Sequence, residues 1–176
     1  MRYELNEPLT KEMAAELKAG DMVLLTGTIY AARDAAHKRL QTMIQNGEAL
    51  PFDLGGAMIY YAGPTPARPG YPIGSAGPTT SGRMDPYTPE LLARGVRATI
   101  GKGPRSQAVI DSMVENTAVY FAAIGGAAAL ISQCIESADV VAFEELGTEA
   151  IRALKVKKLP LVVACDSHGR SVYDHD

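Results

Sequence analysis

The sequence predicts an α/β fold in which strands alternate with helices. Compact apolar runs, such as residues 22–25 and 161–166, are typical of buried strands. Between such runs, apolar residues recur at helical spacing, most clearly in 106–116. Alternation of the two element types favours a layered sheet-and-helix architecture. The 176 residues, of which 47% are hydrophobic, suffice for one core, so we expect 1–176 to form a single domain.

The elements are expected in the following chain order. The strands are residues 2–8 (an edge strand), 22–25, 57–62, 98–100, 118–124, 138–143 and 161–166. The helices are a short one that begins after Thr10 and ends near Gly20, then 33–46, 88–94, 106–116 and 127–135, with an amphipathic pattern at 148–154.

Residues that begin or end helices support these boundaries. Thr10 and Thr88 can act as N-caps, because their hydroxyls accept a hydrogen bond from a backbone N–H. Pro89 and Pro104 suit the first helical position, where a missing N–H has no consequence. Asn46-Gly47 is typical of a helix end and closes 33–46.

The connecting segments are less regular. Gly125-Gly126 is expected to form a turn from strand to helix. The Gly- and Pro-rich stretch 63–86 shows no regular pattern through most of its length, and a loop that long usually has a task or is mobile. The lysine cluster at 155, 157 and 158 is typical of a solvated surface, and 167–176 is expected to be a hairpin-like tail.

Composition argues against several functional classes. The net charge of −3 disfavours a general nucleic-acid binder, and no window approaches the ~20 apolar residues of a membrane span. The polar N-terminal residues show no secretory signal. Cys134 and Cys165 lie in apolar sequence, as reduced, buried thiols of a cytoplasmic protein do. Two cysteines are also too few for a metal site of three or four cysteines, so we expect a cytoplasmic protein whose own residues hold no metal.

Three cations stand at positions where a strand or loop leads into a helix. Arg33 opens a helix, Arg83 lies in the Gly/Thr/Ser-rich loop, and Lys102 is flanked by Gly101 and Gly103. A cation at a helix N-terminus opposes the helix dipole, so these positions make sense if a multiply charged anion completes the site. Arginine forks suit carboxylates, whereas lysine acts as a point charge.

Hydroxyl groups accompany these cations, at Thr79, Thr80 and Ser81. Because ligands of open α/β sheets collect beyond the carboxyl ends of the strands, we expect a site for a small di- or polyanion there. The competing interpretation is that each cation pairs with a nearby acid, for example Arg83 with Asp85, and that Lys102 is a solvated lysine in an ordinary turn. The segment is not a Walker phosphate loop, because glycine and not a hydroxyl residue follows Lys102.

His37 stands one helical turn after Arg33 and shares its face. Its role is open among a general acid or base, a metal ligand, and a histidine that orients its neighbours. The metal role is the weakest, since no second histidine stands at a ligand spacing. His168 is expected to be a turn residue. No Gly-x-Ser-x-Gly elbow follows a strand and no dinucleotide fingerprint is present, which disfavours a serine hydrolase and a dinucleotide enzyme.

With these residues in view, the sequence resembles the β subunit, or C-terminal domain, of class I (iron–sulfur) fumarate hydratase and of its relative L(+)-tartrate dehydratase. The matching segments occur in the family's order and cover nearly the whole chain: 20–39 with Ala-Arg-Asp-Ala-Ala-His, 77–85 with Gly-Pro-Thr-Thr-Ser-Gly-Arg-Met-Asp, 100–106, 125–130 and 145–151. The resemblance implies a swivelling β/β/α domain, a layered sandwich of sheet and helices.

The resemblance also implies an activity. The family hydrates fumarate or dehydrates 2-hydroxydicarboxylates at a [4Fe-4S] cluster, which three cysteines of an α part hold. This chain would then be half of an α2β2-type hetero-oligomer and would receive the cluster from its α subunit. Carried onto this sequence, Arg33, Arg83 and Lys102 bind the substrate carboxylates, Thr79 is a proton-transfer group, and Lys102 and His37 belong to the catalytic set.

Three functions remain open at this point. The first is the β subunit of fumarate hydratase. The second is the β subunit of L(+)-tartrate dehydratase, whose substrate differs by one hydroxyl. The third is a non-catalytic, anion-binding module of the same fold, against which the intact set of Arg33, Arg83, Lys102 and Thr79 argues.

Overall fold

The computed structural model of the chain describes residues 1–123 and 128–173. The strands are β1 (Arg2–Asn6), β2 (Met22–Ala31), β3 (Met58–Tyr60), β4 (Ala98–Gly101), β5 (Val119–Ala123), β6 (Ile135–Ala142) and β7 (Ile151–Cys165). The α-helices are α1 (Lys11–Glu16), α2 (Asp34–Gln45), α3 (Thr88–Ala93), α4 (Gln107–Asn116) and α5 (Ala128–Gln133). Two 3₁₀ helices, η1 (Ser81–Met84) and η2 (Glu144–Glu149), complete the set.

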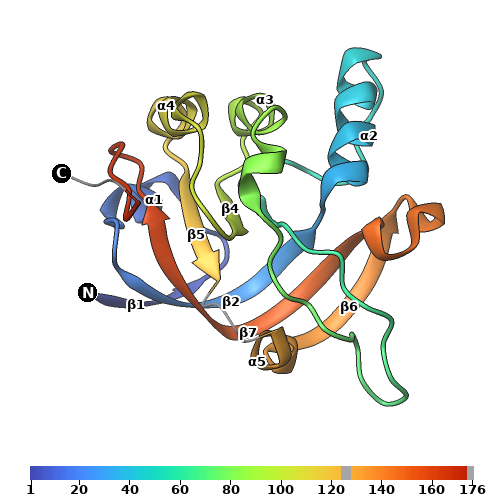
Figure 1. The fold of residues 1–176 in the computed structure, drawn as a ribbon. Coiled ribbons are helices and arrows are strands. Elements are labelled where there is room, and N and C mark those ends of the chain that lie inside the picture. The colour runs from blue at the N-terminus through green and yellow to red at the C-terminus, as the bar shows by residue number, and fades with distance from the viewer. Residues whose placement is uncertain (124–127, 174–176) are drawn as a thin grey trace.

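The sheet closes on itself. The strand order is β1-β2-β3-β4-β5-β7-β6, and β2 pairs with β7 as well, which joins β2, β3, β4, β5 and β7 into a ring (Figure 1). Neighbours from β1 to β5 run parallel, whereas β7 runs antiparallel to β2, β5 and β6. The result is a five-stranded barrel with β1 and β6 attached at its sides.

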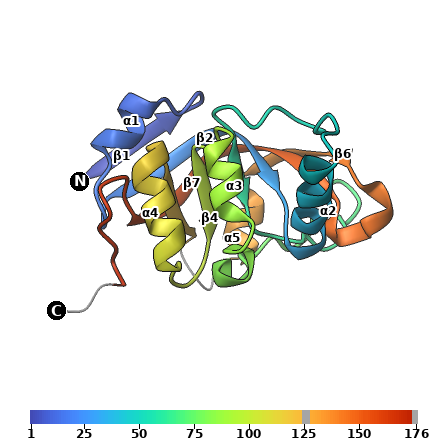
Figure 2. The ribbon, with the colours of Figure 1, turned by 90° about the horizontal axis from the view of Figure 1, so that it is seen from above.

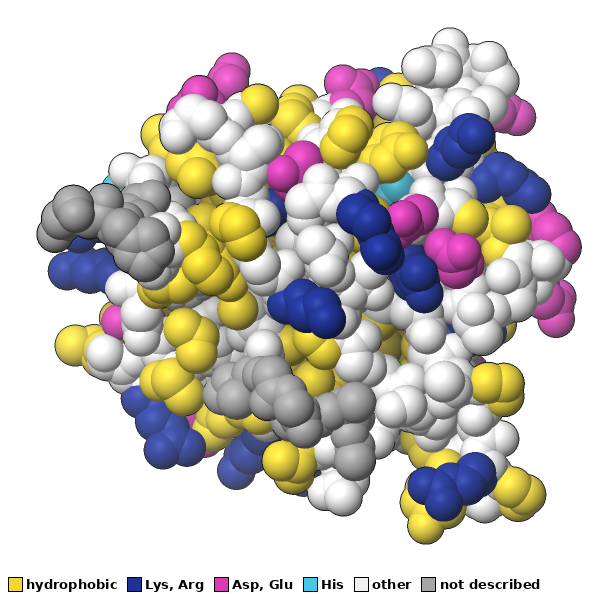
Figure 3. Space-filling view, viewed as in Figure 1, with side chains coloured by type: hydrophobic (Ala, Val, Ile, Leu, Met, Phe, Trp, Pro, Cys, Tyr) yellow, Lys and Arg dark blue, Asp and Glu magenta, His cyan; other side chains and the backbone are white. Residues whose placement is uncertain are grey.

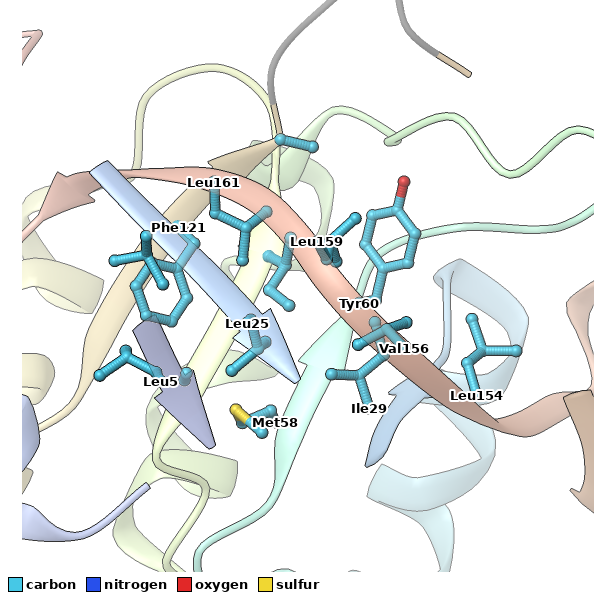
Figure 4. Packing of buried hydrophobic residues seen from close by; sticks show 14 of the residues in the cluster. Leu5, Leu25, Ile29, Met58, Tyr60, Phe121, Leu154, Val156, Leu159 and Leu161 are labelled. Atoms are coloured by element: carbon cyan, nitrogen blue, oxygen red, sulfur yellow. The ribbon is translucent and has the colours of Figure 1, made fainter. Parts of the chain in front are cut away.

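Alternating side chains divide the core into two clusters. Along β4, Ala98 and Ile100 point into the barrel, and along β5 Val119, Phe121 and Ala123 do the same. Figure 4 shows the interior, where residues from several strands meet. The opposite faces of the strands pack under helices α2, α3 and α4, which lie side by side on one side of the barrel (Figure 2). Both faces of the parallel strands are therefore buried.

The structure confirms the α/β class and most of the expected elements. Strand 22–25 continues to Ala31, and 161–166 is only the end of β7, which begins at Ile151. The amphipathic pattern at 148–154 thus falls largely on a strand, and the lysines at 155, 157 and 158 are exposed as expected. The helix expected over 127–135 ends at Gln133, and the strand expected over 138–143 begins at Ile135. Closure of the sheet was not among the expectations, and the swivelling character of the domain stays a prediction.

The helix caps are partly as expected. Thr10 accepts a hydrogen bond from the Met13 N–H over 3.2 Å, which confirms it as an N-cap. Thr88 is not a cap: it lies inside α3, and its hydroxyl donates to the Met84 carbonyl. Pro104 is not the first helical residue either, because Ser106 caps α4 two positions later. Gly125-Gly126 and the last three residues of the expected tail lie outside the described part of the chain.

Candidate functional site

The carboxyl ends of β2, β3 and β4 meet at one edge of the barrel, because these strands are parallel neighbours. Arg33 follows β2 and Lys102 follows β4. The loop after β3 returns to the same edge, where the Thr79 N–H donates to the Tyr61 carbonyl and Thr80 pairs with Lys102 in a short parallel bridge. The structure thereby brings Arg33, Thr79, Lys102 and, through the start of η1, Arg83 to one edge.

The backbone of Lys102 is held on both sides. Its carbonyl accepts from the Ser81 N–H over 2.9 Å, and its N–H donates to the Thr79 carbonyl over 3.3 Å. The Tyr120 hydroxyl donates to the Gly103 carbonyl and accepts from the Ser81 hydroxyl, both over 2.7 Å. A Cβ on Gly101 would lie 2.0 Å from Ser81 Oγ, so only glycine leaves room for this clamp.

The side chain of Lys102, in contrast, makes no ion pair with the described residues. It is exposed, and no carboxylate of the described residues lies within 4 Å of its ammonium group. A backbone held by these hydrogen bonds therefore presents, at the edge, a positive charge that no carboxylate of the described residues compensates. The exposed side chain by itself also agrees with the interpretation of Lys102 as a solvated lysine.

Arg33 is the N-cap of α2 and lies beside Glu149. The Glu149 carboxylate accepts a hydrogen bond from the Ala35 N–H over 3.1 Å and approaches Arg33 Nε to 3.8 Å. The Glu149 carboxylate therefore both caps the first turn of α2 and compensates the charge of Arg33. A Cβ on Gly63 would lie 2.7 Å from Arg33 Cδ, so the missing side chain of Gly63 lets the arginine lie against the segment that follows β3.

Arg83 pairs with the carboxylate next to Arg33. Its Nε lies 3.1 Å from Asp34 Oδ2, and its Nη2 donates to Asp34 Oδ1 over 3.3 Å. The proposed pairing of Arg83 with Asp85 is thus wrong. In Figure 3, basic and acidic side chains lie together near the base of α2. Both partners of the Arg83 pair are about half exposed, with side-chain exposures of 48% and 45%, so other N–H groups of the fork remain open to an anion.

Asp85 pairs instead with Arg105, a partner that the sequence did not predict. The Arg105 side chain is fully buried and donates through Nε to Asp85 Oδ1 over 2.8 Å. Its terminal nitrogens donate to the hydroxyl oxygens of Tyr61, Thr99 and Thr88. Burial alone would lower the pKa of Arg105, but Tyr61 and Asp85 hold it above its ordinary value. This network fixes the loop before α4. In the sequence, the only sign of this role is that Arg105 follows Pro104.

Thr79 is half-buried, and its backbone is fixed between Tyr61 and Lys102. Its hydroxyl makes no hydrogen bond with another described residue. Within the part of the chain that the structure describes, the hydroxyl is thus available at the edge, in the residue whose carbonyl bonds the Lys102 N–H.

His37 lies deeper than the cations. It is 1% exposed, its Nδ1 lies 2.8 Å from the Arg33 carbonyl oxygen, and burial lowers its pKa to about 4. His168 is exposed in a turn, as expected, and its Nε2 lies 2.8 Å from the Ala15 carbonyl oxygen. Of these two histidines, which are the ones in the described part of the chain, His37 adjoins the candidate site and His168 does not.

The described residues form neither a metal-binding cluster nor a membrane-spanning helix. Among residues 1–123 and 128–173, no three His, Cys, Asp or Glu side chains lie close enough together to hold a metal ion. No helix in the described part of the chain is long and apolar enough to cross a membrane.

Comparison with known proteins identifies the family. The family model described as "Fumarase C-terminus" matches residues 1–176. The chain belongs to this family. Within the fumarase C-terminus family, it is 41% identical, over 99% of its length and 92% of the relative's, to a protein of Methanocaldococcus jannaschii named "Putative L(+)-tartrate dehydratase subunit beta".

Other relatives in the fumarase C-terminus family are longer. The chain is 40% identical to the "Putative fumarate hydratase class I" of Geobacillus stearothermophilus, with 97% of this chain and 33% of the relative covered. It is also 40% identical to the "Fumarate hydratase class I, aerobic" of Escherichia coli K12, with 98% and 32% covered. The chain thus spans about a third of these two relatives. The relatives are hydro-lyases by name, which agrees with the resemblance stated from the sequence.

Proposed function

We propose that this chain is the β subunit of a two-subunit iron–sulfur hydro-lyase that reversibly hydrates fumarate to L-malate. The observation that carries the proposal is that Arg33, Arg83 and Lys102 lie together at one edge, where Lys102 has no carboxylate partner among the described residues. Membership of the fumarase C-terminus family supports it, since class I fumarate hydratases are among the relatives. A non-catalytic module would have no need to hold a lysine rigidly without a carboxylate partner.

The proposed roles follow from the residue types. Arg33 and Arg83 bind the substrate carboxylates through N–H groups that Glu149 and Asp34 leave open, and Lys102 adds a point charge. Removing a proton from C3 of malate shifts negative charge onto the neighbouring carboxylate. Fixed cations stabilise that charge more in the transition state than in the substrate, and so they accelerate the reaction as well as bind.

Thr79 is the proposed proton-transfer group. A threonine hydroxyl is a weak base unless nearby positive charge favours its deprotonated form. The backbone N–H of Lys102 bonds the Thr79 carbonyl, so the two residues are neighbours, and we propose that the Lys102 ammonium supplies this charge.

The [4Fe-4S] cluster belongs, in this proposal, to an α subunit. When bound, it would supply a Lewis acid for the hydroxyl that leaves. The described residues of this chain do not fit a cluster: Cys134 lies between α5 and β6, Cys165 lies at the end of β7, and no group of three candidate ligands exists among them. We further propose a cytoplasmic α2β2 assembly, because the chain spans about a third of the two fumarate hydratases and because a relative that it matches along 92% of the relative's length is named a subunit beta.

A substitution of Lys102 tests the proposal. Lys102→Met, coexpressed with the α subunit, is expected to lower kcat/KM for malate at least about 100-fold, as loss of one charge-stabilising group does elsewhere. Lys157→Met, which removes an exposed lysine of β7, is the matched control and is expected to keep full activity. Equal activity of the Lys102→Met and wild-type enzymes would refute the proposed site.

L(+)-tartrate is the second candidate substrate. The relative named as a tartrate dehydratase β subunit matches this chain along 92% of its own length, whereas the two fumarate hydratases are about three times longer. Steady-state rates of the reconstituted pair on malate and on L(+)-tartrate separate the two functions. Turnover of tartrate with a kcat/KM above that of malate would replace the first proposal by the second.

A further inference from the structure

The carbonyl of Arg33 receives two hydrogen bonds from one residue. The backbone N–H of His37 donates to it over 2.9 Å, as in any first helical turn, and His37 Nδ1 lies 2.8 Å from the same oxygen. A carbonyl oxygen can only accept, so Nδ1 carries the ring hydrogen. The other ring nitrogen, Nε2, then holds an unshared electron pair.

The surroundings of the ring bury Nε2. The ring meets Tyr61 edge-on at 5.5 Å and lies tilted against Tyr87 at 5.8 Å. Nε2 is buried and has no hydrogen-bond partner among the described residues. The cavity that His37 lines between α2 and α3 measures only about 20 Å³, which is room for one water molecule and far too little for a dicarboxylate.

The protonation state agrees with this geometry. The pKa of His37 is lowered to about 4, chiefly by burial and also by the nearby Arg105 charge, whereas the bond to the Arg33 carbonyl and the charge of Asp34 oppose the shift. The ring is therefore neutral at physiological pH, in the tautomer that the bond to Arg33 requires.

We propose that His37 is a positioning residue, which fixes the Arg33 carbonyl through Nδ1–H and does not exchange protons with the substrate. The kinetic consequence of this role rests on the proposed function above. Of the roles that the sequence left open for His37, the geometry thus selects the one in which it orients its neighbours.

The effect of the ring extends to both arginines and to Thr79. The Arg33 carbonyl belongs to the peptide group that joins Arg33 to Asp34, so fixing it sets the directions of both residues. Asp34 in turn holds Arg83, at 3.1 and 3.3 Å. On its other side the ring packs on Tyr61, whose carbonyl accepts the Thr79 N–H over 2.7 Å. One buried ring therefore adjoins the supports of both arginines and of Thr79.

Two substitutions separate the two ring nitrogens. In His37→Asn, the side-chain amide nitrogen takes the place of Nδ1 and can still donate to Arg33, whereas nothing replaces Nε2. In His37→Gln, the amide takes the place of Nε2 and the donor to Arg33 is lost. His168→Gln, at an exposed histidine of a distant turn, is the matched control.

The kinetic test uses the chain together with its α subunit and malate as the probe. We expect His37→Gln to raise KM about tenfold with a smaller change in kcat, as loss of one positioning hydrogen bond does. We expect His37→Asn and His168→Gln to keep the wild-type KM. Equal losses of kcat in His37→Asn and His37→Gln would overturn the proposal in favour of catalysis by Nε2. A wild-type KM in both variants, with lowered thermal stability, would overturn it in favour of a purely structural role.

A second measurement on the chain alone distinguishes failure of this inference from failure of the proposed function. In ¹⁵N spectra, His37 should carry its hydrogen on Nδ1, and the Arg83 Nε–H signal should shift in His37→Gln but not in His37→Asn. A hydrogen on Nε2, or equal Arg83 shifts in both variants, would overturn the positioning role. Absence of hydro-lyase activity in the wild-type pair would refute the proposed function and leave these spectra valid.

Discussion

Lowering the pH from about 7 to about 5 should destabilise the wild-type chain by about 2 kcal/mol more than a His37→Asn variant. The pKa of His37 falls from 6.5 to about 4 on folding, because its ring is buried. Between these values the unfolded state binds the proton and the folded state does not. The contribution of the neutral ring is therefore fully present above 6.5 and is lost as the pH falls toward 4.

The comparison with His37→Asn isolates this one group. Carboxylates that titrate in the same range do so in both proteins, and the variant keeps the donor to Arg33. The groups that face the ring are Arg105 and Asp34, the rings of Tyr61 and Tyr87, and Glu90 across the small cavity. Urea unfolding curves of both proteins at the two pH values give the four free energies. If the two proteins lose equal stability on acidification, the ring is not held neutral and the geometry described for it is wrong.

Three further outcomes are expected. Arg105→Met should lower the free energy of unfolding by about 3 kcal/mol or more, because it leaves the Asp85 carboxylate without its buried partner; a cost below about 1 kcal/mol in urea unfolding would contradict this. Gly101→Ala should cost about 1–3 kcal/mol, because its Cβ would lie 2.0 Å from Ser81 Oγ, whereas the control Gly82→Ala meets nothing within 4 Å; equal costs would contradict the clamp. The chain alone should bind malate with a Kd above about 1 mM in calorimetry, and a micromolar Kd would contradict an active site completed by a partner.

Local sequence carries most of the fold. The apolar runs and the helical segments between them predict the parallel strands from β2 to β5, because the pattern that indicates each strand or helix lies within that element's own residues. Closure of the barrel is different in kind. It depends on pairing of β7 with β2, in which Val162 faces Met22, and an extended apolar run does not indicate which strand it will meet. The same limitation explains why only the end of β7 was predicted.

In the candidate site, too, local features were predictable from the sequence and long-range contacts were not. Lys102 is recognisable because two glycines and a following helix stand next to it in the sequence. The carboxylate partners of the arginines are not recognisable from the sequence, because they are distant in it. Asp34 bonds Arg83 across 49 residues, and Glu149, which lies beside Arg33, bonds the Ala35 N–H across 114 residues. Asp85 is close to Arg83 in the sequence and was considered as its partner, but its carboxylate accepts a hydrogen bond from Arg105 instead. Short-range sequence patterns thus predicted which cations lie at this edge and failed to predict the carboxylates that hold the arginines.

The two kinds of cation have different physical consequences. Arg33 and Arg83 are oriented by carboxylates, so their charges are largely compensated and their remaining N–H groups supply direction. Lys102 has no carboxylate partner among the described residues, so its positive charge is the one that is not compensated there. In water the attraction between this charge and an anion is weak, since two unit charges 4 Å apart attract by only about 1 kcal/mol. At an effective dielectric constant of 20, the same two charges attract by about 4 kcal/mol. A partner that covers the edge and excludes water therefore strengthens every one of these contacts without moving a residue of this chain. This is why we expect weak binding of malate by the chain alone, and why an exposed, rigidly held lysine is better suited to a shared active site than to a complete one.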